Sequence, residues 1–256
     1  MTTLDVAGVT VRFGGLTALD GVSLTVGPGE VVGVIGPNGS GKTTLFNVIC
    51  GFVRADEGSV RWDGEPLDRV RPHDLAGRGI ARTLQGVGLF GGLTALENAI
   101  VGAERTARAG ALTGLLGLPR SDRDERALRE RGLEALRRLG VAEDAGRLPG
   151  TLPYGVQKRV ALARALVGEP RLLLLDEPAG GLDEADMKDL GERIAALKGK
   201  TSVLLVEHHM DLVMKVCDRV VVLDFGRRIA AGTPAEVQAD PQVLDAYLGV
   251  ELDAAG

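Results

Sequence analysis

The sequence has little cysteine, few aromatic residues and no long hydrophobic run. Of its 256 residues, 3% are aromatic and two are cysteine. The uninterrupted aliphatic run 172–175 is far shorter than the roughly 20 residues that a membrane-spanning helix needs. The opening MTTLDVAG also lacks the basic and then apolar pattern of a secretory signal. We therefore expect a chain that neither spans a membrane nor enters a secretory route by itself.

An excess of basic charge is also missing. The chain carries 30 Lys and Arg against 35 Asp and Glu, a formal net charge of -5, so its electrostatics give no reason to expect nucleic acid as a partner. Cys50 and Cys217 lie far apart in aliphatic surroundings, which favours small buried thiols over a disulfide or a metal site. This cysteine usage fits a reducing cytoplasm.

The hydrophobic pattern predicts an α/β fold with a mainly parallel sheet. The length allows one large domain or a core with a smaller lobe. Strands alternate with helices from residue 155 to 223, which implies parallel βαβ crossovers. Leucines at helical spacing among Arg and Glu predict a helical lobe with at least two helices over 94–147. The apolar stretch 109–119 fits either a core contact or a loop that faces a partner. The expected elements are strands at 4–10, 19–26, 30–35, 58–64, 79–84, 171–176, 201–207 and 219–223, helices at 42–49, 155–167, 184–197 and 209–216, and two short helices introduced by Pro234 and Pro241.

A phosphate-binding loop stands between the predicted strand 30–35 and the predicted helix 42–49. The sequence GPNGSGKTT matches G-x-x-x-x-G-K-[ST]. Glycines let the backbone turn its N–H groups inward, and the following helix adds its positive end, so the loop can hold a β-phosphate. Lys42 is placed to bridge the β- and γ-phosphates, and the Thr43 hydroxyl can ligate Mg²⁺. The expected ATP-binding residues of this loop are Gly36, Pro37, Asn38, Gly39, Ser40, Gly41, Lys42, Thr43 and Thr44.

An acidic pair follows the apolar strand at 171–176. Asp176 and Glu177 are expected to emerge at the carboxyl edge of the sheet, where ligands of α/β proteins bind. Asp176 fits a carboxylate that holds Mg²⁺. Glu177 faces the other way and fits the base that orients an attacking water.

Five further motifs occur in a fixed order: Gln85 in RTLQ, the stretch LPYGVQ before RVALARAL, the strand end DEP, the GLD that follows it, and His208 in VEHHM. With these motifs the chain resembles the ATP-binding subunits of ABC transporters over nearly its whole length. This resemblance implies a P-loop ATPase core at 1–93 and 160–232 with an antiparallel β-subdomain. It also implies an inserted helical subdomain at about 94–159 and a helical tail at 233–256.

The resemblance implies further roles for single residues. Phe13 would stack on adenine, with a place in the core as the alternative interpretation. Gln85 would sense Mg²⁺ and the γ-phosphate, with a plain surface amide as the alternative. His208 would contact the γ-phosphate, with a capping or core histidine as the alternative. The D-loop of the family corresponds to Gly181, Leu182 and Asp183, and the signature that acts on the partner's nucleotide corresponds to Pro153, Tyr154, Gly155, Val156 and Gln157.

The signature departs from the family pattern. Pro153 stands where the family usually has a serine, and Val156 occupies the usual glutamine position. Gly155 and the following helix still offer N–H groups and a helix dipole. We therefore expect this surface to close on ATP but to contribute less to hydrolysis there, which would make the two sites of a heterodimer unequal.

The resemblance also implies partners and a solute class. Two ATP-binding subunits, identical or different, would close on ATP and Mg²⁺ and drive integral-membrane permease subunits from the cytoplasmic face of the membrane. A solute-binding protein would act only indirectly. The run VEHHMDLVMKVCDRVVVLDFGRRIAAGTPAEV and the ending DAYLGVE resemble the branched-chain amino-acid uptake branch. Urea or amide importers, the lipopolysaccharide-export ATPase, a soluble non-transport ABC ATPase and a P-loop small-molecule kinase are the alternatives.

Overall fold

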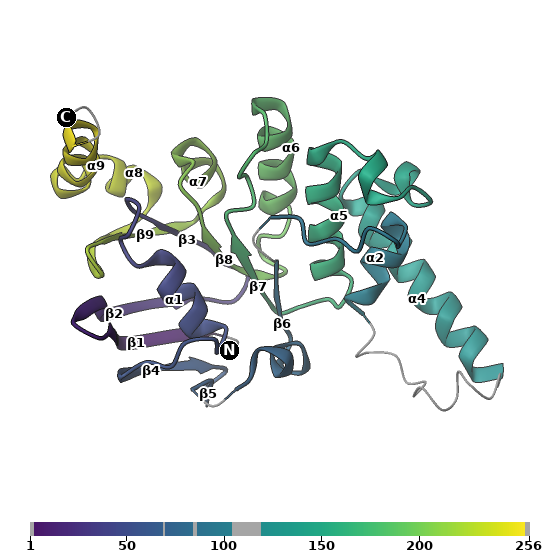
Figure 1. Cartoon of the computed structure of the whole chain (residues 1–256), viewed down its shortest axis with the longest axis horizontal. Helices are drawn as coiled ribbons and strands as arrows, with labels where there is room; N and C mark the ends of the chain where they lie inside the picture. Colours follow the sequence, from purple (N-terminus) through teal and green to yellow (C-terminus); the bar gives the residue numbers. More distant parts are fainter. Residues whose placement is uncertain (1–2, 69, 84–85, 104–118, 254–256) are drawn as a thin grey trace.

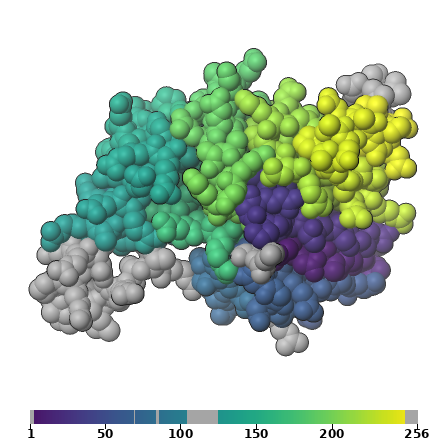
Figure 2. Space-filling view, turned by 180° about the vertical axis from the view of Figure 1, so that it is seen from behind, coloured from purple at the N-terminus to yellow at the C-terminus, as the bar shows by residue number. Residues whose placement is uncertain are grey.

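The computed structural model describes residues 3–68, 70–83, 86–103 and 119–253. Two sheets and the helices around them form the body of the protein (Figure 1). The helices α2 (Ala95–Val101), α4 (Pro119–Arg138) and α5 (Tyr154–Leu166) gather at one end. The yellow C-terminal tail, α8 (Pro234–Gln238) and α9 (Pro241–Asp253), lies at the opposite end (Figure 2).

The smaller sheet is antiparallel, with the strand order β2-β1-β4-β5. Its strands are β1 (Leu4–Phe13), β2 (Leu16–Val26), β4 (Glu57–Trp62) and β5 (Glu65–Pro66). The first two strands are longer than predicted because their ladder continues through register shifts to the pair Phe13 and Leu16. Strand β1 therefore ends at Phe13, beyond the predicted end at residue 10.

The larger sheet has the order β10-β9-β3-β8-β7-β6 and is parallel except for β10. Its strands are β3 (Val31–Ile35), β6 (Ile80–Arg82), β7 (Leu172–Asp176), β8 (Ser202–Val206), β9 (Arg219–Asp224) and β10 (Arg227–Gly232). The sequence did not predict β10, because its partly exposed residues give no buried-strand pattern. The expected α/β architecture with both sheet types is confirmed.

The hydrophobic core lies on both faces of the larger sheet. Alternate residues of β3 point to opposite sides: Val31 and Ile35 join the cluster under the helices, while Val32 and Val34 join the cluster between the two sheets. This arrangement covers the strand on both faces, as its continuous apolar sequence predicts. The strand ends are thereby held in fixed positions beneath the loops that follow them.

Most predicted helices lie within two residues of their expected bounds. α1 (Lys42–Ile49) matches its prediction, and α6 (Glu184–Ala195) and α7 (Met210–Val216) follow β7 and β8. The predicted two-helix lobe corresponds to α2 and α4, and the two proline-initiated tail helices are confirmed. Of the apolar stretch 109–119, residues 109–118 lie outside the described residues. Short 3₁₀ helices cover Pro72–Arg78, Ala142–Asp144 and Pro149–Thr151. Among the described residues, no helix combines the length and apolar character needed to cross a membrane.

Both cysteines are free and buried, as predicted. Burial raises the pKa of the Cys50 thiol to about 11 and that of the Cys217 thiol to about 12. Because only the thiolate is nucleophilic, both side chains are expected to resist thiol reagents at pH 8. A thiol titration of the native protein with a disulfide reagent should report almost no reaction, and the unfolded protein should react at both cysteines. Fast reaction of the native protein would contradict this prediction.

Candidate functional site

The phosphate-binding loop connects the end of β3 to the start of α1. Gly36 and Gly41 have φ values of 151° and 101°, which side-chain-bearing residues rarely adopt. A Cβ atom at Gly36 would lie 2.1 Å from the Leu223 carbonyl oxygen, and one at Gly41 would lie 2.7 Å from the Ala18 carbonyl oxygen. The close approach of neighbouring backbone therefore requires glycine at both positions of the motif.

Lys42 is folded back over this loop. Its Nζ donates hydrogen bonds to the carbonyl oxygens of Gly36 (2.7 Å) and Pro37 (2.8 Å), and the residue is buried. Burial lowers the pKa of the Lys42 ammonium, and the nearby Glu177 carboxylate partly offsets this effect. Ser40 is also buried, and its Oγ has no hydrogen-bond partner among the described residues. The loop thus holds a cation and an unsatisfied hydroxyl, both suited to an anionic ligand.

A cavity of about 370 Å³ brings together residues that are far apart in the sequence. Phe13 and Ala18 line it from the antiparallel sheet, residues 38–44 line it from the phosphate loop, and Glu177 lines it from the end of β7. The Phe13 side chain is 52% exposed, so the alternative that placed it in the core is wrong. An aromatic face beside a phosphate loop is a surface on which an adenine ring can stack.

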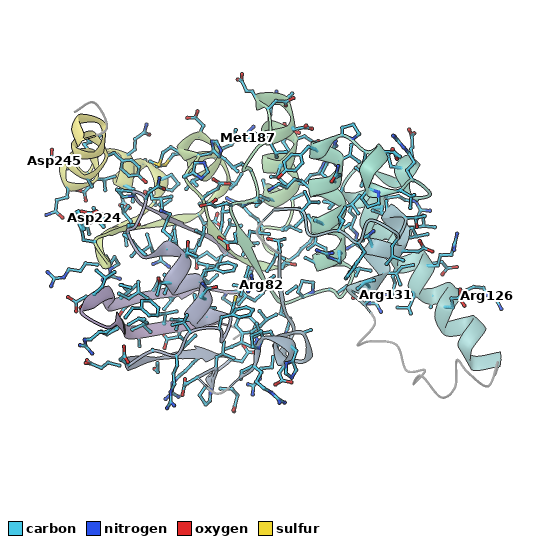
Figure 3. The ribbon with its side chains drawn as sticks, in the orientation of Figure 1. Arg82, Arg126, Arg131, Met187, Asp224 and Asp245 are labelled. Carbon is cyan, nitrogen blue, oxygen red and sulfur yellow. The ribbon has the colours of Figure 1, made fainter. Side chains whose placement is uncertain are left out.

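The acidic pair lies where β7 ends. Asp176 is 7% exposed, and burial, followed by the Glu177 charge, raises the pKa of its carboxyl, while Arg82 on β6 (Figure 3) opposes the shift. Glu177 adopts a left-handed backbone conformation with φ 46°, and its N–H donates to the Val206 carbonyl oxygen at 2.9 Å. A non-glycine residue held in this conformation stores strain, a feature common at functional sites.

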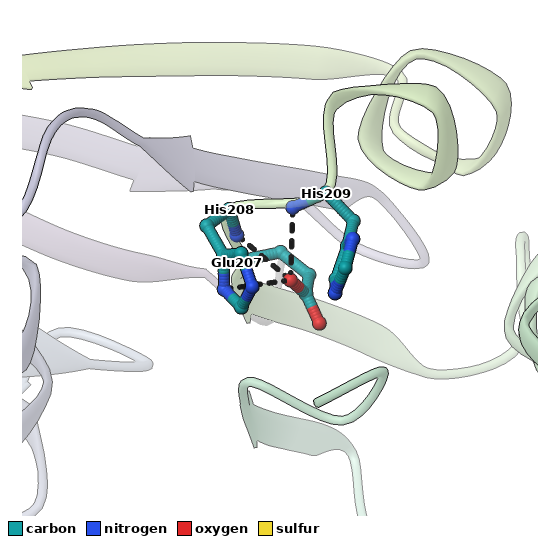
Figure 4. Close-up of side chains that lie close together, drawn as sticks. All are labelled: Glu207, His208 and His209. Carbon is teal, nitrogen blue, oxygen red and sulfur yellow. Dashed lines mark hydrogen bonds and ion pairs between the residues drawn. The ribbon is translucent and has the colours of Figure 1, made fainter. Parts of the chain in front are cut away.

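His208 follows the neighbouring strand β8. Its Nδ1 lies 4.0 Å from Oε1 of Glu177. The same nitrogen lies 3.5 Å from Oε2 of Glu207 (Figure 4). The imidazole is about half exposed, so the core alternative is wrong. The N-cap position of α7 is occupied by His209, which makes no side-chain cap, so the capping alternative for His208 is also wrong. The histidine therefore faces the same acidic turn that lines the cavity.

Glu207, to which the sequence motifs gave no role, lies under this turn. The residue is fully buried at the end of β8. Its Oε1 accepts a hydrogen bond from the N–H of Ala179 at 2.8 Å, and its Oε2 accepts from the N–H groups of His208 (2.7 Å) and His209 (3.1 Å). A glutamate directly after an apolar strand was the available signal.

The signature residues surround the N-terminus of α5. The helix begins at Tyr154, one residue before the predicted start, and Pro153 precedes it without a side-chain cap. The Gln157 N–H donates to the Pro153 carbonyl oxygen at 3.0 Å. N–H groups earlier in the first turn of a helix have no partner within that helix, so they are available to an anion. Val156 and Gln157 are partly buried in this turn.

The residues predicted to form the D-loop lie against those predicted to form the signature. A Cβ atom at Gly181, where φ is 78°, would be 3.1 Å from the Tyr154 ring. The Asp183 side chain caps α6 by accepting from the Asp186 N–H at 2.8 Å, and Leu182 is packed against the hydrophobic core between them. A Cβ atom at Gly155 would lie 2.1 Å from the Asp186 carboxylate, so a larger residue at this position would displace that side chain. Gln85, the remaining predicted site residue, lies outside the described residues.

A second cavity, of about 610 Å³, shares residues 38–40 of the phosphate loop with the first. It is lined by residues 37–40, by the turn between β9 and β10, and by α9, with Asp224 and Asp245 at the same end of the molecule (Figure 3). Phe225 in that turn also lines the first cavity and is 88% exposed. The sequence did not predict a turn at this place, because it did not predict the strand β10 that follows the turn.

Comparison with known proteins identifies the family. A model of the family described as ABC transporter matches residues 19–180, and a model described as branched-chain amino acid ATP-binding cassette transporter matches residues 227–253. The crystal structure of the ADP conformation of an ATP-binding cassette of an ABC transporter has a TM-score of 0.83 and 33% sequence identity. That match covers 97% of this chain and 99% of the other. The chain therefore belongs to the ATP-binding cassette family of transport ATPases, as the sequence motifs predicted.

The chain is similar to curated ATP-binding proteins of branched-chain amino acid transport and of lipopolysaccharide export. The chain is 44% identical to the high-affinity branched-chain amino acid transport ATP-binding protein BraF of Pseudomonas aeruginosa, over 96% of this chain and 97% of the relative. It is 40% identical to LivG of Escherichia coli K12, a protein of the same description, with the same coverage. It is 35% identical, over 90% of both chains, to the lipopolysaccharide export ATP-binding protein LptB of Haemophilus influenzae.

Proposed function

We propose that the chain binds ATP in the 370 Å³ cavity and hydrolyses it to drive a permease that imports branched-chain or related amino acids. The observation that carries the ATPase proposal is the convergence of Phe13, Lys42, Thr43 and Glu177 on one cavity. Phe13 stacks on the adenine, and residues 36–44 hold the phosphates. In the same proposal Gln85, which is not described, contacts the γ-phosphate region and the permease.

Hydrolysis would use the acidic turn and the histidine beside it. Glu177 orients the attacking water as a general base, which requires a carboxylate within reach of the phosphate loop. His208, whose Nδ1 lies 4.0 Å from Oε1 of Glu177, would contact the γ-phosphate. These roles are supported by the placement of both side chains at adjacent strand ends.

The chemistry of Thr43 and Asp176 fits Mg²⁺, although of the two only Thr43 lines the 370 Å³ cavity and Asp176 lies at the end of β7 beside Glu177. A threonine hydroxyl at position 43 and a buried carboxylate at position 176 are hard oxygen ligands of the kind that Mg²⁺ takes together with phosphates. The raised pKa of Asp176, caused first by burial and then by the Glu177 charge, marks a carboxylate that a cation would stabilise. When bound, Mg²⁺ would neutralise charge on the β- and γ-phosphates.

Two such subunits would enclose the nucleotides. A solved relative with 28% identity and a TM-score of 0.74 is a dimer bound to ADP and phosphate. In the proposed dimer the N-terminus of α5 from one subunit and its Gly181–Asp183 loop approach the phosphate loop of the other. ATP favours the closed dimer only through its greater affinity for that state. The helical segment at about 94–159 would serve as the subdomain between the ATPase core and the permease, with 233–256 as a tail.

Replacing Pro153 by serine should raise ATP turnover by a few fold. The serine hydroxyl would supply the hydrogen-bond donor that the signature lacks, and serine is also a favourable N-cap residue worth about 1 kcal/mol over alanine. Steady-state ATPase of the dimer measures the change. Pro153→Ala is the matched control, since it removes the proline without adding a hydroxyl. Equal turnover in the two variants would contradict the role of the missing hydroxyl.

The solute assignment rests on the C-terminal match over residues 227–253 and on the higher identity to BraF and LivG than to LptB. Relatives of that description work in branched-chain amino acid transport, and ABC ATP-binding subunits work with membrane permease subunits. In this proposal the chain is a peripheral protein at the cytoplasmic face of the membrane.

Copurification followed by a transport assay tests the function. A tagged chain captured from detergent-solubilised membranes of its own host should carry integral-membrane proteins and a second ATP-binding subunit or copy. Proteoliposomes made from that complex should accumulate labelled leucine in an ATP-dependent manner, and urea should serve as the comparison solute. Capture of nucleic acid or ribosomes without membrane proteins would instead indicate a non-transport ATPase. Transport of urea but not leucine would reject the amino-acid assignment.

A further inference from the structure

Glu207 uses both of its carboxylate oxygens to join two turns of the site. Oε1 accepts from the N–H of Ala179, and Oε2 accepts from the N–H groups of His208 and His209 (Figure 4). Oε2 also lies 3.5 Å from Nδ1 of the His208 ring. One fully buried side chain therefore holds the turn after β7 and the turn after β8 in a fixed relation.

The two turns that Glu207 joins carry the residues of the chemistry. Ala179 lies between Glu177 and the start of the D-loop at Gly181, while His208 directly follows Glu207. Burying a carboxylate costs free energy unless its charge is matched by hydrogen bonds. Three backbone donors meet that need here, and hydrogen bonds to a charged acceptor are stronger than those between neutral groups. An apolar residue could pack under the turns, but it could not hold their N–H groups.

We propose that Glu207 is a positioning residue for ATP hydrolysis, which sets the His208 ring and ties its position to the turn that leads from Glu177 into the D-loop. This inference rests on the proposed function. A carboxylate oxygen that faces Nδ1 favours the tautomer with hydrogen on that nitrogen, and thereby decides how the other ring nitrogen can act. A shift of the D-loop would move the Ala179 N–H. Because the Glu207 carboxylate is hydrogen-bonded to both Ala179 and His208, that movement would also displace His208.

A double-mutant cycle tests this link. Glu207→Gln keeps the size of the side chain but replaces one acceptor oxygen with an NH₂ group that cannot accept the backbone N–H groups. We expect turnover to fall by about 10 to 100-fold, as for other residues that orient a functional histidine, while the Kd for ATP stays within threefold. Single-turnover hydrolysis with excess protein measures the slow rates. In the double variant with His208→Ala, turnover should be no lower than with His208→Ala alone, because Glu207 acts through that ring.

Two controls separate positioning from folding. Glu236→Gln makes the same chemical change at a glutamate that accepts the Thr233 N–H (2.7 Å) in the tail, and it should leave turnover unchanged. Glu207→Asp keeps the charge but shortens the reach between the turns, so it should also lower turnover. Thermal melting shows that each variant is folded at the assay temperature. The proposal would be overturned if the losses from the two substitutions multiply in the double variant. It would also be overturned if both Glu207 variants are folded and turn over at the wild-type rate, or if Glu207→Gln unfolds while Glu207→Asp is fully active.

A measurement that needs no hydrolysis distinguishes this inference from the proposed function. Nitrogen NMR of the imidazoles at alkaline pH reports the tautomer of His208 in the nucleotide-free protein. The wild-type protein should place hydrogen on Nδ1, and Glu207→Gln should change that preference. Equal tautomer populations in the two proteins would overturn the positioning role. A wild-type chain that hydrolyses no ATP would overturn the proposed function instead.

Discussion

Replacing Lys42 by alanine is expected to abolish ATP binding at micromolar nucleotide and to reduce turnover to background. The Lys42 ammonium lies within the phosphate loop, where Nζ donates to the Gly36 and Pro37 carbonyl oxygens. In the nucleotide complex these bonds would be exchanged for bonds to the β- and γ-phosphates. A hydrogen bond to a charged group contributes about 1.5–3 kcal/mol, so the loss of two corresponds to roughly 10²–10⁴-fold in affinity.

The Kd for a fluorescent ATP analogue, measured by equilibrium titration, checks this expectation. Lys200→Ala is the matched control, because it removes an exposed lysine outside the cavity. Alanine favours helix at the first position of α1, so Lys42→Ala should fold, and its melting temperature verifies this. If Lys42→Ala bound ATP within threefold of the wild-type protein, the nucleotide would not be held by this loop.

The fold was predictable where local sequence and global packing agree. The run 31–35 is apolar and β-branched because both faces of β3 are covered, and its Gly-rich continuation marks the turn into α1. β10 was missed because Arg227 and Arg228 are exposed at the sheet edge, so nothing in the pattern distinguishes the strand from a loop. The strand forms because the turn at Phe225 and Gly226 reverses the chain beside β9.

The site was predictable to the extent that its residues belong to ordered motifs. Lys42, Glu177 and His208 each follow a strand of the parallel sheet, and topology brings those strand ends together. Glu207 lies within the motif VEHHM, but the motif does not show its role, because that role depends on which backbone N–H groups lie within reach of its carboxylate. That information comes from the packing of two turns that are 28 residues apart in the chain. The cavity beside α9 depends in the same way on how the tail packs.

Replacing Glu177 by glutamine is expected to lower turnover by about 10²–10⁴-fold, the contribution of a general base, while ATP binding is retained. Glutamine has the size of glutamate, so the left-handed backbone at this position (φ 46°) need not change. Its amide cannot take a proton from water. The Lys42 contacts with the loop carbonyls remain, so the Kd for ATP should stay within about threefold.

The same variant should accumulate as a closed dimer, which separates a loss of chemistry from a loss of binding. If ATP closes the dimer and hydrolysis opens it, a subunit that binds ATP but cannot hydrolyse it stays in the closed state. Light scattering with and without MgATP measures the dimer, and Glu192→Gln, a change at an exposed glutamate of α6, is the matched control. Turnover near the wild-type rate in Glu177→Gln would remove the water-orienting role from Glu177. If Glu177→Gln lost turnover but formed no ATP-dependent dimer, the water-orienting role of Glu177 would stand. The model in which ATP binding closes the dimer would then be rejected, because ATP binding alone would not bring the two subunits together.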